Sequence, residues 1–342
     1  MKNYILIQIT LSLSLLTSNL KSEEVNDPIE LKPTIVVATK TPKDAKELMP
    51  SIEYIGADSI EDRQIFQLVD SLQYIPGVTI VQTGQQGGAA SLFVRGLESN
   101  HVVTLLNGRR LAPGLAGLYN IELLGTSFLE SVQLAKGPVS SLYGSDAIGG
   151  ALDLRMSDAR FVSVKNNLEL FTEAGSFDTF RSALKYQTKE DRVGIVMDAS
   201  YLHTDNDRPF SQFENLTLRN NIAYEVSDNI HFDLLSFYQG SDLQVPGSEL
   251  GGSFPEPQIN VNESSLISPR LSITEKDWNA QIFFSRTASE LEATQDVFQQ
   301  DNILEQTGNE IEALVNYSVL DNSIWTLGSG YYNYEFSRTP IT

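Results

Sequence analysis

The second half of the chain is dominated by apolar residues that alternate with polar ones, a pattern typical of β-strands. After Phe161 this alternation recurs in one segment after another; Val193, Ile195 and Met197, for example, fall on one face. Successive side chains of a strand point to opposite faces, so each segment predicts a strand with one apolar face. About nine such strands follow one another to residue 336.

The connections between these strands alternate in length. Short turns are expected at 188–191, 227–229, 274–277 and 320–323, and longer polar loops at 204–212, 240–264 and 287–308. Short turns at one end and long loops at the other are typical of an outer-membrane antiparallel β-barrel. A soluble β-sandwich is the alternative, but its strands are shorter and its alternation less regular.

The strand count is too small for a closed barrel of this kind. Single-chain bacterial barrels have an even number of strands, and a barrel that encloses a plugged lumen has about 22. Residues 339–342 read as the start of a further loop. We therefore expect a chain truncated at its C-terminus, with the first nine or so strands of a 22-stranded transmembrane barrel.

The N-terminus has the form of a secretory signal over residues 1–22. Lys2 supplies a positive charge, Tyr4–Leu16 is mostly apolar, and acidic residues follow Ser22. A short membrane anchor is the alternative, but the apolar run is shorter than the roughly 20 residues that a bilayer requires. Export from the cytoplasm is the prediction.

Charge and composition exclude several functions. The chain has 24 basic and 44 acidic residues, a net charge of −20, and nucleic-acid binding needs a basic face instead. It has no cysteine, which excludes disulfides, thiolate catalysis and cysteine-ligated zinc. No Gly-x-Ser-x-Gly or His-Glu-x-x-His motif occurs, so an enzyme has little support.

Residues 49–156 have a mixed α/β pattern. Strands are expected at 51–55 and 79–82, and an amphipathic helix over 67–74, with Asp58 or Ser59 capping an earlier helix. Asn107-Gly108 is a hairpin signal. The run 132–154 reads as a strand, a Gly-Pro turn, a short helical turn, a Gly-Gly break and a second strand.

Several motifs in this region resemble, in order and spacing, the plug domain of TonB-dependent outer-membrane receptors, in particular those that import cobalamin. They are Leu72–Val78, Ser91–Gly96, Leu106–Leu111, Lys136–Pro138 and Leu142–Gly150. The resemblance implies an α+β plug domain followed by barrel strands. The expected division is a signal peptide (1–22), a flexible lead (23–47), a plug (48–157) and a partial barrel (158–342).

A short β-prone run precedes this domain. From its residues alone it is either an ordinary edge strand or a strand offered to a partner. It resembles the TonB box, which implies that TonB, with its inner-membrane energy-coupling complex, binds Thr34, Ile35, Val36, Val37, Ala38 and Thr39. The same resemblance implies a location in the outer membrane of a Gram-negative bacterium, in contact with its lipid.

Two polar loops, 84–91 and 111–120, are the candidate ligand site. Gln85, Gln86, Ser91, Tyr119 and Asn120 offer hydrogen bonds and Leu115 an apolar contact, although flexible solvent loops are an equal alternative. The resemblance makes these loops the outward plug apex. It implies import of a large, scarce ligand, cobalamin by preference or an iron–siderophore chelate, without a required cofactor. A non-transporting surface receptor or adhesin on the same scaffold and a soluble secreted binding module are the alternatives.

Arg95 and Lys136 are basic residues in apolar or small-residue surroundings. Burial would demand carboxylate partners, which we expect on lumen-facing barrel strands. Exposed surface charges are the alternative. Lys136 stands where the family usually has Arg, so its contact would be a point charge instead of a bidentate bond.

An acidic segment, Thr204-Asp-Asn-Asp207, lies in one of the predicted outer loops. Its Asp205 and Asp207, with Asp242 from the next loop, have the oxygen ligands that Ca²⁺ prefers. The spacing does not match an EF-hand, so a solvated acidic turn is the preferred reading. The three histidines show no metal-binding spacing.

Overall fold

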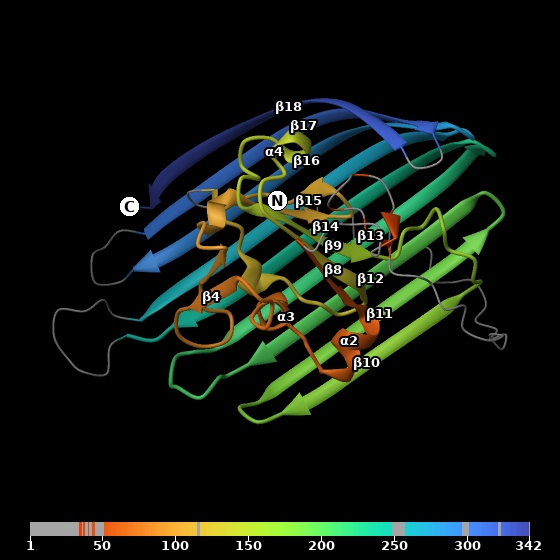
Figure 1. The fold of residues 1–342 in the computed structure, drawn as a ribbon. Helices are drawn as coiled ribbons and strands as arrows, with labels where there is room; N and C mark the ends of the chain where they lie inside the picture. The colour runs from red at the N-terminus through yellow and green to blue at the C-terminus, as the bar shows by residue number, and fades with distance from the viewer. Residues whose placement is uncertain are drawn as a thin grey trace.

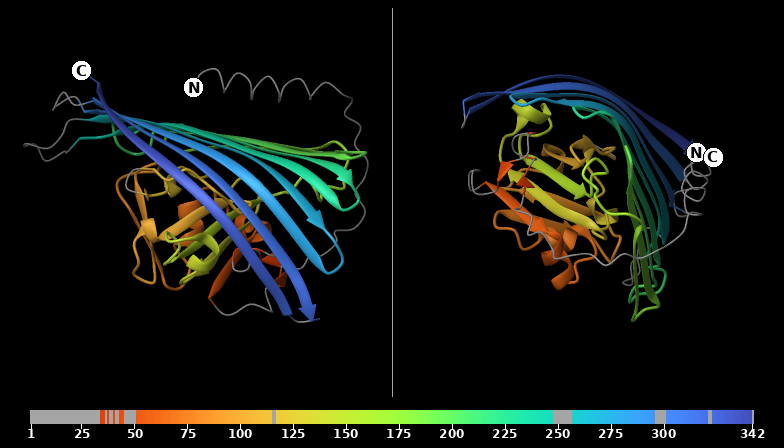
Figure 2. Two further views of the ribbon diagram at one scale, coloured as in Figure 1. Left: turned by 90° about the horizontal axis from the view of Figure 1, so that it is seen from above. Right: turned by 90° about the vertical axis from the view of Figure 1, so that its right-hand side faces the viewer.

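A small α/β domain lies against the concave side of a long, curved β-sheet (Figure 1; Figure 2). The computed structural model describes residues 34–35, 37, 40, 43–44, 51–114, 117–247, 257–295, 301–320 and 323–341. The predicted signal peptide and most of the predicted lead lie outside these residues.

The large sheet contains nine described strands in sequential antiparallel order, in agreement with the expected count. They are β10 (Asn167–Gly175), β11 (Thr179–Glu190), β12 (Val193–Thr204), β13 (Phe213–Ser227), β14 (Ile230–Val245), β15 (Gln258–Thr274), β16 (Trp278–Gln295), β17 (Asp301–Leu320) and β18 (Ser323–Ile341).

The strands β14 to β17 extend well into segments that the sequence predicted to be loops. The ladder between β14 and β15 continues to Val245 and Gln258, and that between β16 and β17 to Ala293 and Asn302. The predicted loops 240–264 and 287–308 were therefore wrong in extent. Each face of the strands mixes polar and apolar residues at this end, so the regular hydrophobic alternation stops while backbone pairing continues.

The two faces of the sheet have opposite character. Along β13 and β14, buried residues alternate with more exposed ones, and the buried set faces the α/β domain. The convex face exposes large apolar side chains, among them Phe180, Tyr201, Tyr224, Phe232, Leu271, Phe284, Ile311 and Tyr331. A continuous exposed apolar face of this size marks a surface that contacts lipid or another protein.

The α/β domain is built on a five-stranded sheet with the order β3-β8-β9-β6-β7. Its strands are β3 (Ile52–Gly56), β6 (Val102–Leu106), β7 (Arg109–Arg110), β8 (Leu129–Lys136) and β9 (Gly150–Met156), and only the β6–β9 pair is parallel. A separate hairpin joins β4 (Val78–Gln82) to β5 (Ala90–Val94). The strand–turn–strand reading of 132–154 corresponds to β8 and β9.

The helices of this domain are short: α2 (Ala57–Asp62), α3 (Leu68–Leu72) and α4 (Ser140–Tyr143), with 3₁₀ turns η2 (Ser99–His101) and η4 (Ile121–Leu123). The predicted caps Asp58 and Ser59 were wrong, because α2 begins one residue earlier and Gly56 occupies its N-cap without a side-chain bond. Within the described residues, no helix is long and apolar enough to cross a membrane.

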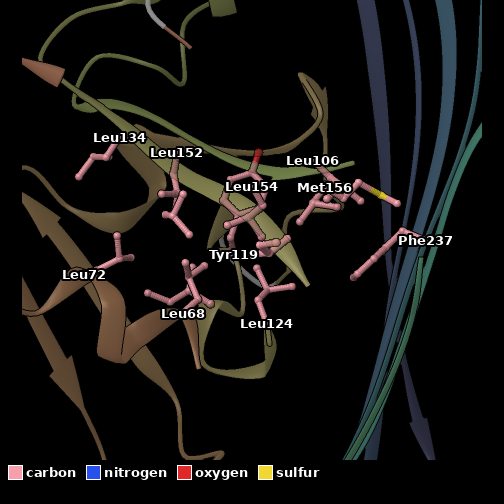
Figure 3. Close-up of a cluster of buried hydrophobic side chains, with 14 of the residues drawn as sticks. Leu68, Leu72, Leu106, Tyr119, Leu124, Leu134, Leu152, Leu154, Met156 and Phe237 are labelled. Carbon is pink, nitrogen blue, oxygen red and sulfur yellow. The ribbon is translucent and has the colours of Figure 1, made fainter. Parts of the chain in front are cut away.

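One hydrophobic core joins the α/β domain to the large sheet. Leu68 and Leu152 are fully buried, and Leu235 and Phe237 of β14 belong to the same cluster. Figure 3 shows Phe237 reaching from the sheet toward Met156. Because burial of such a side chain contributes about 1.5–3 kcal/mol, the sheet wall stabilises the domain directly.

Candidate functional site

The N-terminal segment that contains the predicted TonB box is folded onto the α/β domain. Its β1 (Thr34–Ile35) pairs with β2 (Lys43–Asp44) in an antiparallel bridge. Val37 is fully buried in a second core cluster with Val103 and Tyr143, and its backbone N–H donates to Oε1 of Gln133 at 3.4 Å. Val36, Ala38 and Thr39 lie outside the described residues.

Lys40 attaches this segment to the sheet wall. Its Nζ lies 2.6 Å from Oε2 of Glu312 on β17 and 4.8 Å from the centre of the Tyr143 ring. Both side chains of the ion pair are largely buried, with 10% and 15% exposed, so the pair is screened less than a surface one. The segment is therefore held by one apolar anchor and one ionic contact.

The first candidate ligand loop, 84–91, is tied to the sheet by two glutamines. Nε2 of Gln85 donates to the Gln244 carbonyl at 2.9 Å, and the carbonyl of Gln86 accepts from Nδ2 of Asn206 at 3.4 Å. Both glutamine side chains are half-buried, and Ser91 lies half-buried within β5. The side-chain amide of Gln85 therefore bonds to the wall, which leaves this loop fewer hydrogen-bond donors for a ligand than the sequence suggested.

The second candidate ligand loop, 111–120, lies against β16 and β17. Oγ of Ser289 donates to the Pro113 carbonyl at 3.4 Å, and the amide of Gln306 lies beside the same carbonyl. Tyr119 is buried, with 8% exposed, so it is a core residue in this structure, whereas Asn120 is exposed. Leu115 lies outside the described residues.

Directly after the second loop, the turn η4 carries a buried carboxyl. Glu122 is 6% exposed, and its Oε2 has no hydrogen-bond partner among the described residues. Burial raises the pKa of Glu122 to about 7, although a bond from the Ala90 backbone partly opposes this. Through that bond the carboxyl connects η4 to the strand that follows the first loop.

A buried charge cluster joins the α/β domain, the linker after it and the sheet. At its centre is Asp233 on β14, which is fully buried. Nη2 of Arg109 from β7 lies 2.7 Å from Oδ2 of Asp233, and Nε of Arg270 from β15 lies 2.6 Å from Oδ1. Isolated charges could not be buried here, so the three residues require one another.

The linker between β9 and β10 adds a second acid and a third base to this cluster. Nη2 of Arg160 lies 2.7 Å from Oδ2 of Asp158, and Nη2 of Arg270 lies 3.5 Å from the same oxygen. Burial alone would raise the pKa of Asp158, but Arg160 and Arg270 hold it well below its usual range. The Ala159 N–H donates to Oδ1 of Asn221 at 2.7 Å, which fixes the linker backbone.

Arg110, adjacent to Arg109, points to a different part of the wall. Its guanidinium lies 3.6 Å from Oε1 of Glu310 on β17 and 4.7 Å from the centre of the Tyr332 ring on β18. The two adjacent arginines of β7 therefore contact β14 and β17 respectively. Together they fix the orientation of the domain within the curve of the sheet.

The sequence-based expectation for Arg95 and Lys136 differs from the structure. Arg95 is exposed and its guanidinium donates to Oγ of Ser51, whereas Lys136 is buried and pairs with Glu53 of the α/β domain itself. Neither contacts a carboxylate of the described sheet strands. Lys136 needs a partner because it is buried, but its own β-sheet supplies one across the β3–β8 pair.

The candidate calcium ligands lie near the outer end of the sheet. Asp205 and Asp207 are exposed, and Asp242 lies opposite Glu214 in the β13–β14 ladder. Oδ1 of Asp205 accepts from Gln212 at 3.2 Å. No group of three or more acidic or histidine side chains in the described part of the chain is arranged to hold a metal ion. The calcium site stays a prediction.

Sequence reasoning missed the residues that hold the domain most firmly, namely Lys40, Arg109, Arg110, Asp158 and Arg160. A signal for two of them was present. The hairpin motif places two arginines directly after a buried apolar strand, and the burial argument applied to Arg95 holds equally for them. Their partners on the large sheet, Asp233 and Glu310, lie more than 120 residues away, at positions that only the folded sheet defines.

The geometry as a whole defines a class of protein. A small α/β domain lies in the concavity of an antiparallel sheet, tied to it at its N-terminal segment, its loops and its C-terminal linker (Figure 2). This is the arrangement of a plug domain and the barrel wall that encloses it.

Comparison with known proteins supports this class. Residues 44–151 match the family described as the TonB-dependent receptor plug domain. A vitamin B12 transporter, BtuB, of Vibrio vulnificus strain CMCP6 is 35% identical over 145 residues, which cover 41% of this chain and 23% of the relative. That of strain YJ016 is 25% identical over 287 residues, 81% of this chain and 45% of the relative.

Solved structures share the fold at lower identity. The ferripyoverdine receptor of the Pseudomonas aeruginosa outer membrane superposes with a TM-score of 0.73 at 14% identity, over 90% of this chain and 45% of that one. BauA, the ferric preacinetobactin receptor of Acinetobacter baumannii, gives 0.73 and 14%, over 90% and 50%. The chain spans at most about half the length of these relatives.

Residues 44–151 therefore belong to a TonB-dependent receptor plug domain, and the nine described antiparallel strands that follow form a sheet along one side of it. The chain is a protein of the outer membrane. TonB-dependent receptors are not enzymes, in agreement with the missing catalytic motifs.

Proposed function

We propose that this protein takes part in TonB-coupled import of a large, scarce ligand across the outer membrane, with cobalamin as the ligand. The observation that carries the proposal is the separation of two functional ends along one strand. On β17, Gln306 lies beside the apex loop and Glu312 binds the N-terminal segment. Six residues of strand separate them by about 20 Å, so ligand and TonB would act at opposite ends of the plug.

The state of the N-terminal segment supports a coupled mechanism. TonB would bind this segment by strand addition, which requires free backbone hydrogen-bonding groups. In this structure Thr34 and Ile35 already pair with β2 and Val37 is buried. The segment must therefore leave the plug before TonB can bind it, and ligand binding at the apex would favour that release.

The choice of cobalamin rests on sequence relatives that are named as vitamin B12 transporters. An iron–siderophore chelate is the second candidate, because the solved structures with this fold include siderophore receptors. At 14% identity those structures support the fold and not the ligand.

Deletion of Thr34–Thr39 in the full-length protein tests the proposal. Uptake of radiolabelled cyanocobalamin into cells should be lost, because TonB has no segment to bind, while binding at the cell surface is retained. Deletion of residues 25–30, of the same length, is the control and should leave uptake intact. Uptake that survives the first deletion would contradict the TonB-box assignment.

A further inference from the structure

The outer part of the sheet shows a separation of charge between its two faces. Ser289 and Gln306 face the plug and lie beside the Pro113 carbonyl, so they mark the height on the sheet at which the second loop (111–120) contacts the wall. The next inward row toward the outer end, two residues further along each strand, joins Ser241, Asn262, Leu291 and Leu304 in register. We call these two rows the upper lumen wall.

The upper lumen wall on β14 to β17 is electrically neutral. It consists of hydroxyl, amide and leucine side chains, and the described residues of these rows include no carboxylate. On β18, Arg338 falls opposite Leu304 and donates to Oδ1 of Asn302 at 2.9 Å. The wall therefore offers hydrogen bonds and apolar contact with a single cation.

Carboxylates at the same height lie on the opposite face. The outward positions carry Glu214, Asp242, Glu263, Glu290, Glu292 and Glu305. Glu263, Glu290 and Glu305 are directly opposite one another across three strands. Like charges in such positions repel, so this arrangement costs stability that a mixed distribution would avoid.

This distribution has a consequence for any ligand that approaches the apex. The acidic outer rim creates a negative potential around the mouth, which disfavours the approach of anions. At these two rows of the described strands β14 to β18, a polyanion would lose hydration and find Arg338 as its counter-charge, whereas a neutral ligand could bond to Asn262 and Gln306 and pack on Leu291 and Leu304.

We propose that the upper lumen wall selects a large, electrically neutral ligand with amide groups, of the corrinoid type, over a polyanionic iron chelate. This inference rests on the proposed import function, because it assumes that the ligand enters through this lumen. It assigns specificity to wall residues of β15 to β17, in addition to the plug loops.

Binding by the full-length protein in detergent tests the selection. The probes are cyanocobalamin, which is neutral and carries amide side chains, and a ferric tris-catecholate chelate, which is a trianion. Cyanocobalamin should bind at least about 100-fold more tightly, a difference well outside measurement error. Tighter binding of the chelate, or no measurable binding of cyanocobalamin, would overturn the proposal.

A matched pair of variants locates the effect. Asn262→Asp places a carboxylate on the upper lumen wall and should weaken cyanocobalamin binding about tenfold or more, because it removes an amide donor and adds a charge that the bound ligand would desolvate. Asn309→Asp makes the same change on the outward face, where Nη1 of Arg286 lies 2.8 Å from its Oδ1, and should leave binding within twofold. Equal effects of the two variants would overturn the assignment.

The two proposals fail in different ways. Uptake of the iron chelate that depends on Thr34–Thr39 would overturn the selection of neutral ligands and leave TonB-coupled import intact. Cyanocobalamin binding that distinguishes Asn262→Asp from Asn309→Asp, without any effect of the deletion on uptake, would contradict the import mechanism alone.

Discussion

At the scale of single residues, buried charge does most to position the plug. Asp233 is fully buried and contacts Arg109 of the plug and Arg270 of the wall, while Asp158 in the linker balances Arg160. A buried ion pair adds less stability than its contacts suggest, because both charges lose hydration. Loss of one partner, in contrast, leaves an uncompensated charge. Specific orientation of the plug is the expected benefit.

Asp233→Asn tests this reading. It should lower the free energy of unfolding of the full-length protein in detergent by about 3–5 kcal/mol, because two arginines lose their charged partner in a buried site. Glu225→Gln on the neighbouring strand β13 is the control. It removes the partner of Lys189 in a partly solvated ion pair and should cost less than about 1 kcal/mol. Similar losses for the two variants would contradict the role of the cluster.

Glu122 predicts a dependence of plug stability on pH. Its folded pKa is raised to about 7 from an ordinary 4.5, so the folded plug holds this proton more tightly than the unfolded chain. Stability from this group is therefore fully present below about pH 4.5 and lost as pH rises toward 7, by roughly 3 kcal/mol.

Glu122→Gln keeps an acceptor for the Ala90 N–H and removes the titration. The variant should melt at a higher temperature than the wild type at pH 8 and at nearly the same temperature at pH 4.5, measured by scanning calorimetry. If the melting temperatures of variant and wild type differed by the same amount at both pH values, a group other than Glu122 would be responsible for the pH dependence of stability.

At the scale of elements, the first apex loop depends on close approach of its backbone to the wall. Gly87 has a φ of +85°, and a Cβ there would overlap the ring of Phe213, which is fully buried on β13. Gly84 has a similar φ of +74° but open space around it. The two glycines therefore differ in packing and not in backbone conformation.

Gly87→Ala should destabilise the protein more than Gly84→Ala by about 1–3 kcal/mol, because both share the cost of a left-handed backbone but only the first overpacks the ring. Phe213→Leu in the Gly87→Ala background should recover part of the loss. Equal melting temperatures for the two alanine variants would show that the loop does not pack on Phe213 as described.

The upper ends of β14 to β17 illustrate how an element can be hidden from its sequence. These segments read as loops because each face mixes polar and apolar residues without regular alternation, yet their backbones pair in register up to residues 295 and 301. Pairing with a neighbour satisfies backbone donors and acceptors whatever the side chains are. Their polarity reflects a place beyond the apolar band of the outer surface, not an absence of strand.

At the scale of the whole molecule, the plug is attached to the wall at both of its ends. The N-terminal attachment to the wall is one ion pair, Lys40–Glu312, beside the contact of Val37 with the plug itself, whereas the C-terminal attachment is the buried cluster around Asp233. The N-terminal segment is thus the one that a modest free energy can release.

Val37→Cys reports on that release, because the chain contains no other cysteine. The thiol should react slowly with a water-soluble maleimide, since Val37 is fully buried. Glu312→Gln should accelerate labelling about fivefold, the factor that corresponds to about 1 kcal/mol. Glu305→Gln, on the same strand but facing outward, is the control and should leave the rate unchanged. Equal rates for both variants would contradict the role of Lys40–Glu312.

Much of this protein was predictable from local patterns. The period-two segments predicted an antiparallel sheet of nine strands, and Asn107-Gly108 predicted a hairpin that the structure forms with φ values of 48° and 78°. Such features depend on neighbours in the chain, where side-chain alternation and backbone conformation act directly. The order of motifs also identified the plug domain that residues 44–151 contain.

The partners of charged and polar side chains were decided by the tertiary structure alone. Lys136 pairs within the plug, Arg109 reaches Asp233 across 124 positions of sequence, and Tyr119 is buried where a ligand contact was expected. A charged side chain requires a partner when it is buried, and a basic residue in apolar sequence surroundings predicts that requirement. Which residue meets it depends on strand register and on the curvature of the sheet, and these arise only when the whole wall has formed.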